Sequence, residues 1–101
     1  MEKNLELISE NSRIIMQDIE VLKTLIREEA AIHRDLRKTY QEYISGEISK
    51  KMYEELVNAY TQEISQLRSR AANILYRIIE ASRRIYESAY SEIKKISESL
   101  E

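Results

Sequence analysis

The chain contains no Cys, Pro, Phe or Trp, and it has only one Gly in 101 residues. The absence of Cys excludes disulfides, thiol catalysis and thiolate metal sites. It is also typical of a reducing compartment, so we expect a cytoplasmic protein. The first 20 residues carry seven charged side chains, which argues against a signal peptide. No stretch approaches the roughly 18–20 apolar residues of a membrane span, so none is expected.

The composition that remains is 43% hydrophobic and 34% charged, with a net charge of −2. This mixture is typical of long helices and coiled coils. The small net charge gives no overall attraction to nucleic acid or to anionic lipid. A chain of this length forms one core, so residues 1–101 are expected to be a single all-helical domain.

The single Gly lies near the middle, in the segment YISGEISKKMYEEL at residues 43–56. Gly46 is suited to the position just after a helix, where the backbone adopts positive φ. Ser49 is a candidate N-cap for the next helix, and Ile48 and Tyr53 have the spacing of a hydrophobic staple. We predict a turn at about 45–49 between helices at about 4–45 and 50–98. The capping residues SENS at 9–12 leave a first-helix start at 12 open.

Apolar residues of the second segment recur in alternating steps of four and three from Tyr53 to Ile85. This heptad pattern is typical of coiled-coil packing. It predicts a self-association seam formed by Val57, Tyr60, Ile64, Leu67, Ile74, Ile78 and Ile85. The next apolar residues, Ala89 and Ile93, follow in steps of four and predict a local stutter.

The predicted fold is an all-α antiparallel hairpin of two long helices. Both helices carry apolar stripes wider than one hairpin seam can cover, which favours a homodimer that forms a four-helix bundle. The first helix has two such stripes, one containing Leu7, Ile14 and Val21 and one containing Leu5, Ile15 and Ile19. The alternative is a three-helix bundle, with the second helix broken within SQLRSRAAN at 65–73.

Five arginines in the second helix form the main charged feature: Arg68, Arg70, Arg77, Arg83 and Arg84. A turn centred near residue 47 would place position 10 beside about 84 and position 20 beside about 74. The arginines would then face the acidic residues Glu6, Glu10, Asp18 and Glu20. Alternatively, they could contact the phosphates of a nucleic acid or a partner protein. The net negative charge favours pairing within the chain.

No residues form a catalytic, cofactor-binding or metal-binding constellation, so we expect no enzymatic activity and no cofactor. His33 is the only His, and it follows Glu29 by four residues, whereas di-iron bundles use a spacing of three. Tyr40, Tyr43, Tyr53 and Tyr60 are expected to pack together as an aromatic plug at the turn end of the hairpin.

Residues 43–64, YISGEISKKMYEELVNAYTQEI, resemble a turn of archaeal coiled-coil proteins, the archaeal cell-division protein CdvA family among them. The resemblance implies a self-assembling scaffold near membrane or DNA, and it is carried by six residues: Gly46, Ile48, Ser49, Tyr53, Leu56 and Tyr60. The sequence as a whole predicts a non-enzymatic protein–protein interaction or scaffolding module that self-associates, with an unknown protein partner. The alternative is a nucleic-acid-binding helical protein that uses the Arg residues.

Overall fold

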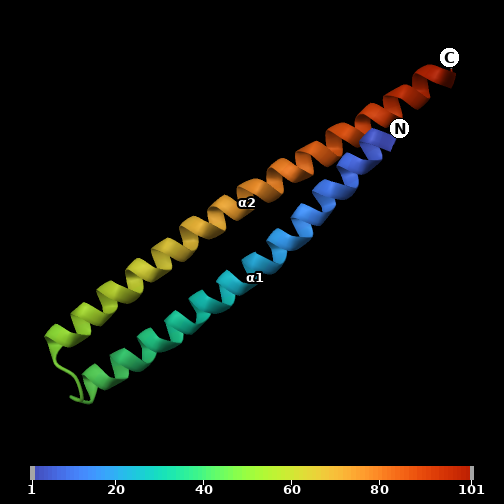
Figure 1. Cartoon of the computed structure of the whole chain (residues 1–101). Helices are drawn as coiled ribbons and strands as arrows, with labels where there is room; N and C mark the ends of the chain where they lie inside the picture. Colours follow the sequence, from blue (N-terminus) through green and yellow to red (C-terminus); the bar gives the residue numbers. More distant parts are fainter. Residues whose placement is uncertain (1, 101) are drawn as a thin grey trace. The chain divides into compact units, whose positions relative to one another are not determined.

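Two long α-helices make up nearly all of the computed structural model, which describes residues 2–100. Helix α1 is Glu2–Ile44 and helix α2 is Lys50–Leu100. The helices run antiparallel, side by side, on either side of one turn (Figure 1). This confirms the predicted all-α hairpin.

Two alternatives from the sequence are wrong. Helix α2 continues without a break through residues 65–73, so the chain is not a three-helix bundle. No Pro or Gly lies in that stretch, and nothing there interrupts the backbone hydrogen bonding. Helix α1 begins at Glu2 and passes through residues 9–12, so these capping residues do not start the helix.

Gly46 ends α1 as predicted, with a φ of 81°. The amide of Glu47 donates to the carbonyl of Glu42 at 2.9 Å, and the amide of Gly46 donates to the carbonyl of Tyr43 at 3.1 Å. These two bonds form a Schellman motif, which satisfies carbonyls that the end of a helix would leave without partners. Because this motif requires positive φ at one residue, the only Gly occupies that place.

Ser49 caps α2. Its hydroxyl oxygen accepts a hydrogen bond from the Met52 amide at 3.1 Å, as an N-cap side chain does. Next to the cap, the ring of Tyr53 stacks on Tyr43 with 4.6 Å between centroids and lies 6.3 Å from the ring of Tyr40. The predicted aromatic plug is therefore present for these three tyrosines, while Tyr60 is half-buried on the same helix.

The chain divides into two compact units, each built from part of both helices. The terminal unit is Met1–Val21 with Asn73–Glu101, and the turn unit is Leu22–Ala72. Both units share the same two continuous helices, so this division does not test whether the chain is a single domain. That expectation stays a prediction.

The buried residues follow a strict spacing of seven along each helix. In α1 they are Asn11, Asp18, Leu25, Ile32 and Thr39, and in α2 they are Ile74, Ala81 and Ser88. Such spacing places all of them on one face of each helix, the face that lies against the other helix. Four of these eight side chains are polar, which apolar periodicity alone does not predict.

The buried face therefore differs from two details of the sequence prediction. In α1 two residues of the first predicted stripe, Leu25 and Ile32, are buried, but toward the N-terminus Leu7 and Val21 are exposed while Asn11 and Asp18 are covered. In α2 it continues without a stutter to Ser88, and Ile93 is 65% exposed. The register is kept at this end by a hydrogen bond from the Asn4 amide to the Glu92 carboxylate.

Candidate functional site

The residues of the predicted self-association seam lie on the face of α2 that packs against α1. Ile74 is buried, and Val57, Tyr60, Ile64, Leu67, Ile78 and Ile85 are half-buried. The seam therefore holds each unit of the hairpin together. The six half-buried side chains retain some exposed surface that a second copy could contact. Self-association through this seam stays a prediction.

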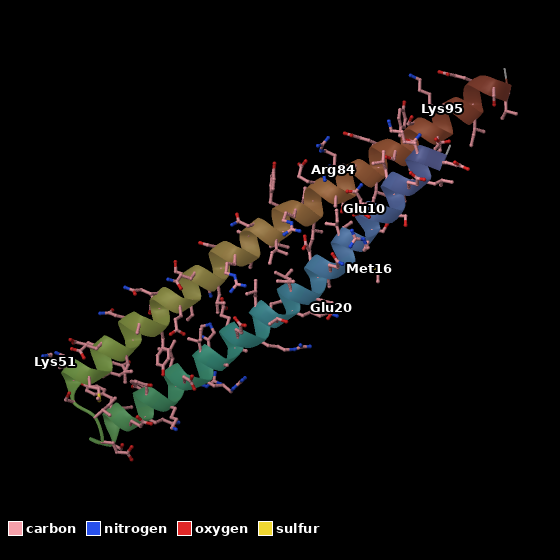
Figure 2. All side chains as sticks on the ribbon, viewed as in Figure 1. Glu10, Met16, Glu20, Lys51, Arg84 and Lys95 are labelled. Atoms are coloured by element: carbon pink, nitrogen blue, oxygen red, sulfur yellow. The ribbon has the colours of Figure 1, made fainter. Side chains whose placement is uncertain are left out.

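Exposed apolar side chains are concentrated in the terminal unit. Of the seventeen large apolar residues that are exposed in residues 2–100, thirteen belong to this unit, although the two units are of similar size. On α1 they are Leu5, Leu7, Met16, Ile19 and Val21, and on α2 they are Leu75, Tyr76, Ile79, Tyr86, Tyr90, Ile93, Ile96 and Leu100. The side chain of Met16, 69% exposed, projects outward from α1 (Figure 2).

Six of these residues recur along α2 in steps of three, four or seven, and we name them the outer stripe of α2: Leu75, Ile79, Tyr86, Tyr90, Ile93 and Ile96. Leu75, Ile79 and Tyr86 each follow a residue of the buried face by one position, so the stripe is turned about 100° away from α1. Its exposed fractions range from 47% to 71%. The rings of Tyr86 and Tyr90 stack on each other with centroids 6.4 Å apart.

The interior of the terminal unit contains polar side chains beside the apolar Ile74 and Ala81. Asn11, Asp18 and Ser88 are each less than 8% exposed. Asn11 donates from its side-chain amide to the Leu7 carbonyl at 2.7 Å. At the end of the seam, the hydrogen bond from Asn4 lowers the pKa of Glu92, whose side chain is 13% exposed. Such polar side chains contribute to the register of the helices, and they leave less apolar surface buried there than an entirely apolar seam would.

Asp18 is the buried carboxylate of this seam. Its side chain is 6% exposed, and Oδ2 lies 3.3 Å from Nε of Arg77 on α2. Oδ2 is itself buried and accepts no hydrogen bond within the described residues. The pair therefore joins a desolvated charge to an arginine that is 63% exposed.

In the turn unit, Arg68 reaches across to Glu29. Nε of Arg68 donates to Oε1 at 2.8 Å and Nη2 donates to Oε2 at 3.3 Å. This two-point hydrogen bonding lowers the pKa of Glu29, whose side chain is 26% exposed. Nε2 of His33 lies 3.4 Å from Oε2 of the same carboxylate. Sequence reasoning missed this partner of Arg68, because it assigned the acids of residues 6–20 to the arginines.

The other three arginines divide into two kinds. Arg83 binds two acids of its own helix, Glu80 at 2.8 Å and Glu87 at 2.7 Å, and the bond lowers the pKa of Glu80. Arg70 and Arg84 form no hydrogen bond or ion pair with another described residue. Three of the five arginines are thus held within the chain, and among the predicted acids Asp18 contacts one of them, Arg77.

The groove between the helices of the turn unit is lined by Glu28, Glu63 and Arg70 around Ile32 and Leu67, with no Ser, Thr, Cys or His among its lining residues. From residue 2 to residue 100, no three His, Cys, Asp or Glu side chains gather as a metal site. Neither described helix has an apolar stretch long enough to cross a membrane.

Comparisons with known proteins do not assign this chain to a family. The resemblance of residues 43–64 to the CdvA family stays a prediction. No protein-family model, curated protein or solved structure matches this chain.

Proposed function

We propose that the chain is a non-enzymatic protein–protein interaction or scaffolding module that self-associates through coiled-coil-like packing of its helices. One observation carries the proposal: thirteen of the seventeen exposed large apolar side chains lie in the terminal unit, six of them in the outer stripe of α2. Contiguous apolar surface of this extent marks an interface in water-soluble proteins.

The distribution of polarity supports the same conclusion. The terminal unit buries three polar side chains, Asn11, Asp18 and Ser88, in its seam, while the apolar side chains of Ile79, Tyr86 and Ile93 remain exposed. Covering the outer residues would remove apolar surface from water at about 25 cal/mol per Å². The four-helix bundle of two hairpins is the simplest assembly that does so.

Charge permits two copies to approach. The described part of the terminal unit contains nine acidic and seven basic residues, so its net charge is small. Arg83 already has Glu80 and Glu87 as partners. An interface beside Arg83 would therefore not bury its guanidinium without a counterion.

A molar mass measured by light scattering on the full chain, with and without single- and double-stranded DNA, tests this function. The chain has a mass of 12.0 kDa, and the proposal expects twice that value. A mass of 12.0 kDa throughout a concentration series would refute self-association. A complex with DNA that weakens steeply with salt would instead favour the alternative in which the arginines bind nucleic acid.

A further inference from the structure

We infer that a second copy of this chain packs antiparallel along the outer stripe of α2, about a two-fold axis that passes beside Tyr86. The inference rests on the proposed self-association, and it adds the face, the orientation and the register of the contact. A two-fold contact uses the same surface on both copies, so the stripe must be complementary to itself.

The spacing of the stripe meets that requirement. Ile79 and Ile93 each lie seven residues from Tyr86, and Leu75 and Ile96 lie eleven and ten residues from it. An antiparallel copy centred on Tyr86 therefore places Ile79 against Ile93 and Leu75 against Ile96. Apolar residues meet apolar residues in every one of these layers, as bundle packing requires.

Small residues make room for the tyrosines at the centre. Ser82 and Ala89 occupy the stripe four residues before and three residues after Tyr86. In the antiparallel arrangement, Ser82 of one copy lies level with Tyr90 of the other and one residue, about 1.5 Å along the axis, from Ala89, on both sides of the central layer. The rings of Tyr86 and Tyr90, which are 71% and 58% exposed, would fill the space beside these small side chains.

Charge distinguishes the two orientations. Glu80 lies near the beginning of the stripe and Lys94 near its end, one on either side of the centre. An antiparallel copy brings Lys94 beside Glu80 of its partner, whereas a parallel copy would set Lys94 beside Lys94 and Glu80 beside Glu80. Opposed helix dipoles favour the antiparallel orientation as well.

The stripe extends along residues 75–96 of α2, and its six side chains are 47–71% exposed. A second copy would therefore cover apolar side chains over roughly 32 Å of the helix, at 1.5 Å per residue. Leu5 and Ile19 of α1, 55% and 39% exposed, lie on the same flank of the terminal unit and would extend the contact into a four-helix bundle.

Single cysteines test the orientation directly, because the natural chain has none. Disulfide formation requires Cα atoms within about 7 Å of each other. Under mild oxidation, most of the Tyr86→Cys chain should become a covalent dimer. Tyr76→Cys, which is exposed on α2 but outside the stripe, is the matched control and should remain uncoupled.

Two less disruptive variants test the register. When Ser82→Cys and Ala89→Cys chains are mixed, the cross-link should join 82 to 89. Ser82→Cys alone should stay uncoupled, because its two copies would be about 12 Å apart along the axis at 1.5 Å per residue. Mass spectrometry of the linked peptides identifies the pairs.

The outcomes separate this inference from the proposed function. A dimeric mass with 82–82 and 89–89 cross-links would overturn the antiparallel orientation while self-association stands. A dimeric mass without any of these cross-links would overturn the choice of face. A monomeric mass would overturn both.

Discussion

Nε of Arg77 lies 3.3 Å from Oδ2 of Asp18, and the two residues join the helices of the terminal unit across a seam that buries the carboxylate but not the guanidinium. Because Oδ2 accepts no hydrogen bond within residues 2–100, its loss of hydration is offset by one electrostatic contact. The pair therefore contributes more to choosing the register of the helices than to stability.

Substitutions at the two positions should act in opposite directions. Asp18→Leu removes the desolvated charge and leaves Arg77 in water, so the free energy of unfolding should rise by about 1–3 kcal/mol. Arg77→Ala leaves Asp18 buried without a cation, so the free energy of unfolding should fall by about 1–2 kcal/mol. Urea unfolding of both variants measures the difference. A loss of stability in Asp18→Leu would contradict this description of the seam.

Gly46→Ala should destabilise the hairpin by about 1 kcal/mol, because an L-residue resists a positive φ. No atom lies within 4 Å of an added Cβ, so the cost is conformational and not a steric clash. Gly46→Asn is the matched control, since Asn adopts this conformation more readily, and it should lose clearly less. Thermal unfolding followed by circular dichroism compares them. Equal losses in the two variants would disprove the conformational cause.

Ser49→Ala should lower the free energy of unfolding by about 1 kcal/mol, because the Met52 amide loses its side-chain acceptor. Ser49→Asp retains an acceptor and should preserve stability. Ser45→Ala is a useful control on the other side of the turn, where the hydroxyl donates to the Glu42 carbonyl at an exposed site. If Ser45→Ala cost as much as Ser49→Ala in urea unfolding, the N-cap would not be the cause.

The Glu29–Arg68 pair should make stability depend on pH. In the folded chain the pKa of Glu29 lies below the ordinary value of 4.5. The ionised carboxylate therefore contributes stability above pH 4.5, and this contribution is lost as the pH falls through the folded pKa. Glu29→Gln should therefore melt at a lower temperature than the natural chain at pH 7, with a difference that shrinks below pH 4.5. The neighbouring variant Glu28→Gln serves as control. A difference that stays constant with pH would exclude this pair as its source.

The turn could be predicted from the sequence because its determinants are local. Gly46 and Ser49 are needed by the backbone of residues 42–52 itself, whatever the rest of the chain does. The continuity of α2 followed likewise from the absence of Pro and Gly. These parts of the fold depend on a few adjacent residues.

The register of the seam could not be predicted from apolar periodicity, because polar side chains occupy half of its buried positions. A signal was nevertheless present: steps of seven from Leu25 lead back to Asp18 and Asn11. The contacts of Asn4 with Glu92 and of Tyr43 with Tyr53 shift the pairing by about two residues from a turn centred on residue 47. Glu29 was missed for another reason: the arginines were assigned to the acids of residues 6–20, although a turn centred on residue 47 already places position 68 beside about 26.

Sedimentation equilibrium of the natural chain beside Ile79→Glu and Ile44→Glu tests most directly whether the outer stripe is the self-association surface. Ile79 and Ile44 are 62% and 63% exposed, so neither substitution disturbs a buried site, but only Ile79 lies in the stripe. The natural chain and Ile44→Glu should sediment at twice 12.0 kDa, and Ile79→Glu at 12.0 kDa. A natural chain that stays at 12.0 kDa, or an Ile79→Glu chain that associates as the natural one does, would contradict the account.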